Sequence, residues 1–460
     1  MRGWGMGFRP EHMIYVEFDV IRVFQEGVPN DLRNVRAFCF VDSQDPEESA
    51  RLARYKIEQS GWKVLQDRCI PTKVSQANFE NREWGAEAYN RASQRGFAIV
   101  FVGVSEEQGS KDPHPVQLPF QSEIDLAETF ALRKKIRVMG QCLYYRTSEC
   151  DEMIEAHSIQ RSGVLSLIAE DSEVFVPSSS HTDLKRNNGR IVLRRRPIGG
   201  VSTFRGFCKR HDNEIFRPID DKFLVPTTEQ ALLYAYRVLG REIAAKRDAL
   251  RNYETQLENP GLTSATRKLI SDMAIGTGHG LKNLMRQKEF FNASHRDRTF
   301  DDIRYVAFCT RTKPSIVFSG GLFPETGFYR EKIQNLMGGN LDQLFFSFAP
   351  MADGWAFLFT WHKKSDISSE AFLGSLAYSQ RASDRIEDLL FGMILSVCEN
   401  LAIAPRWMAA RKPDEIRKLE TATSSGVSVF ASHEMRDIID GVKGISDWEF
   451  DSVIDSRHST

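Results

Sequence analysis

Four residues in two short segments have side chains suited to holding one zinc ion. Cys150 and His157 lie in ECDEMIEAHSIQRSGVL, and Cys208 and His211 lie further along the chain in STFRGFCKRHDNEIF. Zinc usually takes four nitrogen or sulfur ligands in a tetrahedron, and a Cys-x-x-His pair on a tight turn supplies two of them. The sequence therefore predicts a zinc site completed by a second pair of ligands from the earlier segment.

Two choices exist for that second pair. In the first arrangement Cys150, His157, Cys208 and His211 fill all four positions, which is typical of a structural site. In the second arrangement Cys142 replaces His157, which is then free to act as a base. The gap between Cys142 and Cys150 is longer than the two to four residues typical of a zinc knuckle, and this favours the first arrangement.

The same segments resemble the HNH and treble-clef zinc modules. AHSIQRSGVL is similar to the part of these modules in which a histidine ends one strand of a ββα-metal unit, and FCKRHDNEIF is similar to the later knuckle and the helix that follows it. The resemblance implies that His157 is a general base activating water against a phosphodiester. It also implies that Asp212 or Asn213 occupies the orienting polar position, and we take His157 and Asn213 as the catalytic pair. A nuclease of this type would use Mg²⁺ or Mn²⁺ in addition to zinc.

An arginine-rich segment, LKRNNGRIVLRRRPIGG, lies between the two pairs of ligands. Asn188-Gly189 is typical of a type I′ turn, so the segment predicts a basic hairpin. Such a hairpin can bind the phosphate backbone of DNA or RNA with salt-dependent affinity. Alternatively, its arginines pair with Glu170, Asp171 and Glu173. The predicted nucleic-acid contacts are Lys185, Arg186, Arg190, Arg194, Arg195 and Arg196.

Composition and charge exclude some classes of protein. The 61 basic and 62 acidic residues nearly cancel, so any surface for a polyanion must be local. The seven cysteines have no regular spacing, which predicts a reducing cytoplasm and not a disulfide framework. We expect no membrane partner, because no segment approaches the roughly 18 apolar residues of a membrane span.

The elements that position these residues predict a multidomain α+β protein. Residues 1–137 read as an N-terminal α+β domain whose β-α-β opening suggests a ferredoxin-like half. Residues 138–225 are expected to form a central treble-clef-like or ββα-like zinc module that includes the basic hairpin. Residues 226–300 predict a helical hairpin that begins with a capping box at Thr227 and Gln230.

The last part of the chain returns to strands. Residues 301–420 predict an antiparallel sheet with covering helices, in which Trp355, Phe357, Phe359 and Trp361 share one face of a strand. Residues 421–460 read as a flexible tail. Within the preceding helical hairpin, the glycines at 276–280 interrupt the apolar pattern of the second helix, and they are expected to serve a kink or close helix packing.

Two classes of function fit these features. One is a zinc-binding protein with an HNH-like or treble-clef-like module that engages nucleic acid, extending to an active nuclease with His157 as base. The other is a non-enzymatic interaction or scaffold protein in which zinc is purely structural. The position of His157 relative to the metal distinguishes them.

Overall fold

The computed structural model describes residues 13–22, 35–43, 45–59, 62–67, 71–79, 83–103, 131–132, 134–137, 140–178, 180–187, 191–220, 222–259, 262, 264–336, 338–425 and 435–457. The chain divides into two compact units. One comprises Met1–Asp125 with Leu257–Asp272, and the other comprises Leu126–Gln256 with Met273–Thr460.

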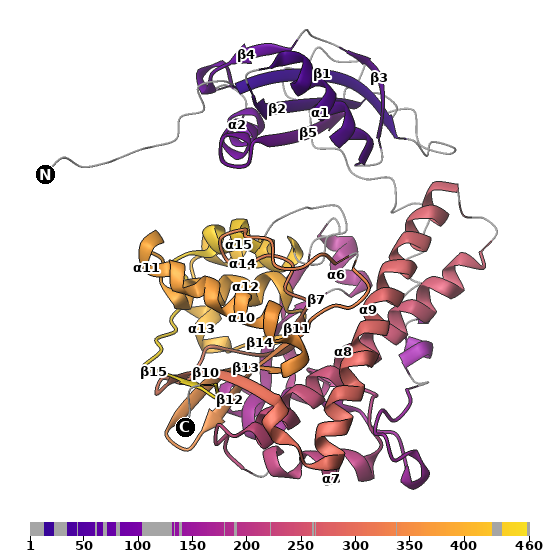
Figure 1. Ribbon diagram of the computed structural model, residues 1–460, viewed down its shortest axis with the longest axis vertical. Coiled ribbons are helices and arrows are strands. Elements are labelled where there is room, and N and C mark those ends of the chain that lie inside the picture. The colour runs from indigo at the N-terminus through magenta and orange to yellow at the C-terminus, as the bar shows by residue number, and fades with distance from the viewer. Residues whose placement is uncertain are drawn as a thin grey trace, which may run out of the picture. The chain divides into compact units, whose positions relative to one another are not determined.

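The first unit is built on one antiparallel sheet with strand order β3-β1-β2-β5, and β4 pairs with β1 (Figure 1). Its strands are β1 (Met13–Arg22), β2 (Val35–Asp42), β3 (Trp62–Asp67), β4 (Thr72–Val74) and β5 (Phe97–Gly103). Its two helices are α1 (Pro46–Gln59) and α2 (Glu83–Arg95). Side chains alternate between the two faces of a strand, and both faces of this sheet are apolar. Ile14 and Val16 of β1 pack with Ala53 of α1, whereas Phe40 of β2 packs with Ala88 of α2.

The β-α-β segment expected in this unit is present as β2, α1 and β3, because β2 and β3 both run antiparallel to β1 and are therefore parallel to each other, with β1 between them. The two strands of a β-α-β unit run parallel in this way. Strand β1 precedes the segment, and β1 and β2 are direct antiparallel neighbours, with Met13 opposite Asp42 and Val20 opposite Val35. The ferredoxin-like assignment itself stays a prediction.

The second unit is centred on an eight-stranded antiparallel sheet with strand order β15-β10-β13-β12-β11-β14-β7-β8. Its strands are β7 (Glu173–Ser178), β8 (Val192–Pro197), β10 (Ile303–Thr310), β11 (Ile316–Leu322), β12 (Leu344–Met351), β13 (Gly354–His362), β14 (Leu401–Ile403) and β15 (Ser452–Asp455). A separate pair, β6 (Ala156–His157) and β9 (Thr203–Phe204), forms a two-stranded sheet.

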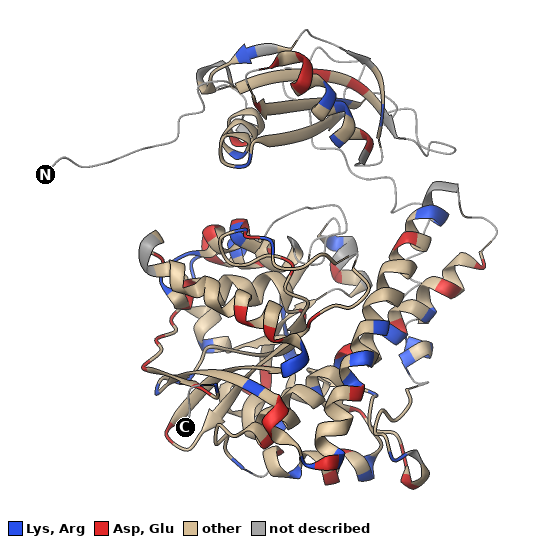
Figure 2. Ribbon diagram, in the orientation of Figure 1, with Lys and Arg blue, Asp and Glu red and all other residues tan. Residues whose placement is uncertain are grey.

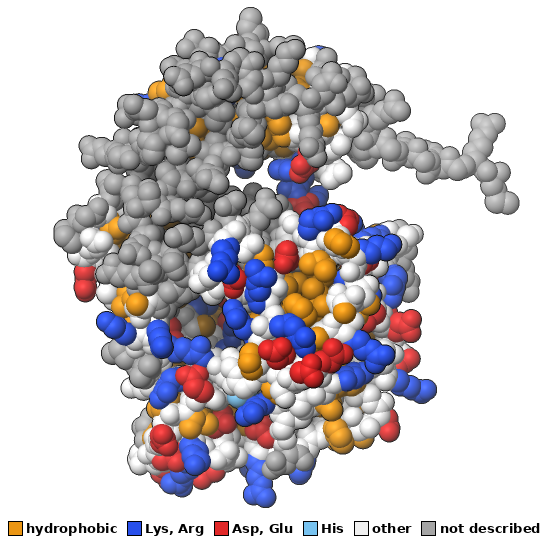
Figure 3. All heavy atoms as spheres, turned by 180° about the vertical axis from the view of Figure 1, so that it is seen from behind, with side chains coloured by type: hydrophobic (Ala, Val, Ile, Leu, Met, Phe, Trp, Pro, Cys, Tyr) orange, Lys and Arg blue, Asp and Glu red, His pale blue; other side chains and the backbone are white. Residues whose placement is uncertain are grey.

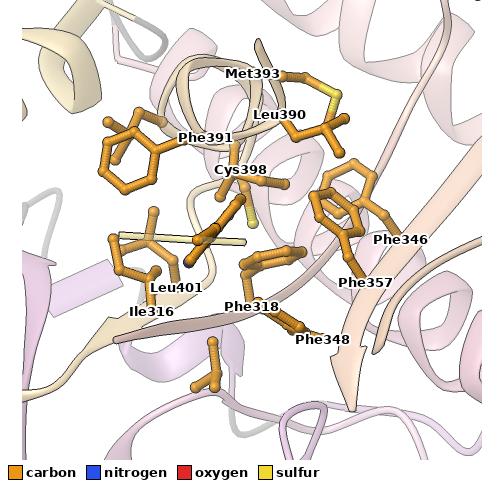
Figure 4. Packing of buried hydrophobic residues seen from close by; sticks show 14 of the residues in the cluster. Ile316, Phe318, Phe346, Phe348, Phe357, Leu390, Phe391, Met393, Cys398 and Leu401 are labelled. Carbon is orange, nitrogen blue, oxygen red and sulfur yellow. The ribbon is translucent and has the colours of Figure 1, made fainter. Parts of the chain in front are cut away.

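Helices cover both faces of the large sheet (Figure 1). They are α5 (Ser166–Ile168), α6 (His181–Arg186), α7 (Lys209–Asp220), α8 (Thr228–Leu257), α9 (Ser264–Asp297), α10 (Asp366–Gly374), α11 (Ser379–Ala382), α12 (Ile386–Val397), α13 (Pro405–Ala409), α14 (Pro413–Ser425) and α15 (Met435–Val442). The predicted alternation in β13 holds, and both of its faces are buried. Phe357 packs with residues of α12, as Figure 4 shows, whereas Leu358 packs with residues of α7 and α8.

The cap predicted for α8 is present, because the Gln230 amide donates to Thr227 Oγ1 at 3.3 Å. Helix α9 runs through the glycines at 276–280, as the prediction of a second helix here expects. A side chain on Gly280 would meet Lys246 of α8 at 3.2 Å, so this glycine allows close helix packing.

Two further differences between the structure and the predictions concern the boundaries of the predicted regions. Strands β7 and β8 come from the region predicted as a separate zinc module, yet they extend the sheet formed by residues 301–420. The predicted tail, 421–460, contributes α15 and β15, and Trp448 packs in the core. No helix among the described residues is both long and apolar enough to cross a membrane.

Candidate metal centre

Three cysteines and one histidine of the second unit converge on a small volume. The sulfur atoms of Cys142, Cys150 and Cys208 and one ring nitrogen of His211 all lie within 4.8 Å of one another. His211 Nδ1 is 3.5 Å from the sulfur of Cys142, 3.6 Å from that of Cys150 and 3.2 Å from that of Cys208. The four ligand atoms are therefore close enough to bind one metal ion.

Backbone hydrogen bonds bring the two ligand-bearing segments together. The Leu143 amide donates to the Gly206 carbonyl at 2.8 Å, and the Lys209 amide donates to the Glu152 carbonyl at 2.8 Å. An isolated bridge also pairs Met153 with Cys208. These bonds hold residues 143–153 against residues 206–209. Cys142 and Cys150 therefore lie close to the start of α7.

The later pair of ligands is presented by the first turn of α7. The Cys208 carbonyl accepts the Asp212 amide at 2.9 Å, so Cys208 and His211 are one helical turn apart and lie on one side. Backbone amides of His211 and Asp151 also donate to the Cys208 sulfur. Asp151 further accepts the Arg210 amide at 3.0 Å and fixes the start of the helix. The sequence analysis did not identify this role of Asp151.

Burial and mutual repulsion affect the ionisation of the thiols. Cys208 and His211 are fully buried, whereas Cys150 is exposed at the surface. Although the Cys150 side chain is exposed, partial desolvation of its sulfur within the cluster, together with the neighbouring Cys142 and Cys208, raises the pKa of Cys150 to about 12, and burial raises the pKa of Cys208. Three thiolates at this spacing repel one another, and a divalent cation among them would offset that repulsion.

Aromatic rings enclose His211. The Tyr144 ring is 4.5 Å from the His211 ring, and Tyr145 Oη contacts His295 Nδ1 of α9 at 3.3 Å. Lys288, also on α9, is buried and lies within electrostatic reach of Cys142. A metal ion with three thiolates carries one excess negative charge, which a lysine at this position would balance.

His157 is not part of the cluster. It lies in β6 opposite Thr203, and its ring is placed to donate to the backbone at Ile198 and Gly199. Burial lowers its pKa, nearby Arg161 and Arg237 lower it further, and the donation to the backbone partly opposes this lowering. The sequence analysis favours His157 as a ligand beside Cys150, Cys208 and His211, but the structure places Cys142 in the fourth position. The long gap between Cys142 and Cys150 is accommodated because the backbone bonds described above hold both ends.

The predicted orienting residues lie on α7. Asn213 is exposed, whereas Asp212 is largely buried and its Oδ1 has no hydrogen-bond partner among the described residues. Burial raises the pKa of Asp212 to about 6, and the nearby Arg237 partly offsets that effect. Arg237 itself donates to both carboxylate oxygens of Asp220, at 2.7 and 2.6 Å.

The predicted basic hairpin differs from the structure. Lys185 and Arg186 belong to α6 and not to a strand, and Arg190 lies outside the described residues. Only Arg194, Arg195 and Arg196 lie on a strand, β8, which pairs with β7.

The arginines of β8 are paired with acids: Arg195 with those that the alternative interpretation names, and Arg194 and Arg196 with Asp183, which it does not name. Arg195 is 3.2 Å from Glu173 and 3.8 Å from Asp171. Arg194 and Arg196 approach Asp183 of α6 at 3.0 and 3.4 Å. Hydrogen bonds from Ser178 and Ser180, together with Arg194, lower the pKa of Asp183 to about 2.

Charges of both signs are interspersed over the second unit. Figure 2 shows basic and acidic residues alternating along its helices, and the face drawn in Figure 3 is similarly mixed.

Comparison with protein-family models finds no match to this chain, and comparisons with curated proteins and with solved structures find none either. The functional argument accordingly rests on the geometry of the site.

Proposed function

We propose that this protein binds one Zn²⁺ through Cys142, Cys150, Cys208 and His211, and that the metal has a structural role. The observation that carries the proposal is the convergence of four ligand atoms of the types zinc prefers, all within 4.8 Å of one another. Four protein ligands complete a tetrahedron and leave no open position for a substrate.

The metal would fasten two segments that are far apart in the sequence. Residues 142–150 carry two ligands, and the start of α7 carries the other two. Phe207, next to Cys208, is fully buried and packs against Phe216 and Tyr236, so the ligands are directly attached to the core. Metal binding would then contribute free energy of folding to this core. This supports a zinc-stabilised interaction or scaffold protein.

Metal analysis of the purified protein tests the proposal. We expect close to one zinc per chain, and we expect Cys208→Ser to lose the metal and to unfold at a lower temperature. Cys309→Ser is the matched control, because Cys309 is a partly buried cysteine of β10 that is not in the cluster. Wild-type protein without bound zinc, or equal zinc content in both variants, would contradict the proposal.

Nucleic-acid cleavage by an HNH-like or treble-clef-like module is a second candidate function. It is favoured by His157 remaining outside the metal cluster with an Nε2 atom that has no partner among the described residues. The paired strands β6 and β9 followed by α7 are similar to a ββα unit into which α5, β7, α6 and β8 are inserted, with His157 on the first strand. In this function His157 would accept a proton from water, and Mg²⁺ or Mn²⁺ would stabilise the charge developing on the phosphate. Asn213 would orient the histidine or the substrate.

Cleavage assays separate the two candidates. If the protein is a nuclease, His157→Ala abolishes Mg²⁺- or Mn²⁺-dependent cleavage of DNA or RNA while the zinc content stays the same. Any nucleic-acid binding should weaken with salt and with Arg186→Ala or Arg194→Ala. Wild-type protein that cleaves neither DNA nor RNA would leave the structural role as the function of this module.

A further inference from the structure

A cavity of about 440 Å³ lies between the β7–β8 hairpin, the turn before β9, α8 and the start of β14. Three arginines from three separate parts of the chain line it: Arg137, Arg196 on β8 and Arg241 on α8. Among the described residues of its lining, Glu399 is the only acidic one. The cavity is distinct from the metal cluster, because it shares no residue with it.

Each of the three guanidinium groups is held in place by an acidic residue outside the cavity lining, and Arg137 also by Thr203 of the lining. Arg137 donates to Glu155 at 2.6 Å and to the Thr203 carbonyl at 2.9 Å, and Arg196 contacts Asp183 at 3.4 Å. Arg241 donates to Glu242. In each of these contacts the arginine uses one terminal nitrogen, whereas a guanidinium has five N–H donors in a rigid fork. The remaining donors can therefore serve a ligand.

Another part of the cavity wall, at Ser202 and Asn400, belongs to a polar network. Ser202 lies in the left-handed region with φ 62°, which is unfavourable for a residue other than glycine. Its hydroxyl accepts the Ile159 amide at 2.9 Å and contacts Ser158 Oγ at 2.8 Å. Asn400 donates to the same Ser158 oxygen at 2.8 Å and to Ser319 Oγ at 2.8 Å. These bonds hold the strained turn in a fixed position at the edge of the cavity.

We propose that this cavity binds a small phosphate ester. Arginine forks match the geometry of phosphate oxygens, and each of these three arginines keeps donors beyond the single nitrogen that contacts its carboxylate partner. The volume lies within the range of small-molecule sites. The apolar side chains of Val176, Val201 and Leu401 would contact the organic part of the ligand, and Glu399 would accept a hydrogen bond from one of its hydroxyl groups.

Titration with three probes tests the proposal: inorganic phosphate, ribose 5-phosphate and ribose. Binding is measured by calorimetry and by broadening of the ³¹P resonance. We expect ribose 5-phosphate to bind more tightly than inorganic phosphate and ribose not to bind. Equal binding of ribose and ribose 5-phosphate, or no binding of either phosphate, would overturn the proposal.

Neighbouring arginines of β8 provide a matched pair of variants. Arg196 lines the cavity, whereas Arg195 is not among its lining residues and pairs with Glu173. Both side chains are about equally exposed, 47% and 39%, so neither substitution should unfold the protein. We expect Arg196→Ala to weaken ribose 5-phosphate binding about tenfold or more, and Arg195→Ala to leave it unchanged. Equal losses in the two variants would indicate a general charge effect and would contradict the proposal.

A further variant separates this site from the zinc site. Arg137→Ala should also weaken binding of ribose 5-phosphate, since Arg137 lines the same cavity. Zinc content should be unchanged in all three arginine variants, so the proposal can fail or succeed independently of the proposed metal. Retention of wild-type affinity by both Arg137→Ala and Arg196→Ala would exclude this cavity as the binding site.

Discussion

The sulfur of Cys208 is the ligand atom nearest to His211 Nδ1, and it also receives two backbone amide hydrogen bonds. Amide donors directed at a sulfur favour its thiolate form, which is the form that binds metals. The identity of the fourth ligand can be tested by substituting Cys142 and His157 separately, because Cys142 lies in the cluster and His157 does not.

We therefore expect Cys142→Ser to release zinc and His157→Ala to retain it. Serine is a poor zinc ligand, whereas the alanine substitution leaves the four clustered side chains intact. Zinc content after dialysis against a weak chelator measures the difference. Loss of zinc from His157→Ala, with retention by Cys142→Ser, would restore the arrangement favoured by the sequence.

A second prediction at the residue scale concerns His362 at the end of β13. This side chain is buried, its Nδ1 accepts the Lys364 amide at 3.1 Å, and it stacks on Phe290. Burial lowers its pKa to about 4, although Asp302 partly opposes the shift. A lowered histidine pKa stabilises the fold fully above the ordinary value near 6.5, and this stabilisation is lost as the pH falls towards 4.

The free energy of unfolding should consequently decrease by roughly 2 kcal/mol from this group between pH 6.5 and pH 5. Urea unfolding at the two pH values measures it. His362→Gln, which retains a hydrogen-bond acceptor but does not titrate, should show a smaller decrease. The same decrease in both proteins would mean that other groups cause it.

At the scale of elements, α7 and α8 approach closely where α8 has a glycine. A side chain on Gly240 would lie 2.6 Å from the Phe207 ring, which is fully buried beside Cys208. Gly276, in contrast, is an exposed glycine inside α9 with no atom within 4 Å of an added Cβ. The two glycines therefore have different roles in long helices.

We expect Gly240→Ala to lower the free energy of unfolding by about 1–3 kcal/mol through overpacking, and to weaken zinc retention by displacing Phe207. Gly276→Ala should raise it by up to about 1 kcal/mol, because alanine is the better helix former. Thermal unfolding with zinc analysis tests both changes. If Gly240→Ala is neutral, the close approach of Phe207 does not constrain the site.

Local elements were the most predictable part of this fold. The cap at Thr227 and the alternation in β13 depend on neighbouring residues, so the sequence alone indicates them. Helix α9 continues through its glycines because a glycine lowers helix propensity by only about 1 kcal/mol, which packing against α8 can offset. The positions of β7 and β8 in the large sheet depend on β14, a strand far away in the sequence.

At the scale of the whole molecule, residues near the end of the described chain complete the core. The Trp448 ring lies 5.4 Å from Phe391 of α12 and 5.5 Å from Phe348 of β12, and its side chain is 3% exposed. The interpretation of 421–460 as a tail failed because short elements in a polar segment carry little periodic signal. The metal cluster was easier to anticipate, since the types of its residues were unusual, but the choice between Cys142 and His157 depended on strand pairing.

Trp448→Ala should therefore lower the free energy of unfolding of the second unit by about 3–5 kcal/mol, whereas Trp448→Phe should cost less. Hydrogen exchange measured by mass spectrometry should show the loss of protection in β10–β13 and not in β1–β5, whose core clusters contain no residue of that sheet. An unchanged exchange rate in β12 and β13 would contradict this role.

The strand order has a consequence for synthesis of the chain. The outer edge of β10 is paired only with β15, a strand of four residues that is made long after β10 itself. Until those residues leave the ribosome, the unpaired N–H and C=O groups of β10 can pair with another growing chain. Truncated products that end before Ser452 should therefore aggregate more readily than the full chain, even where their remaining elements are able to fold.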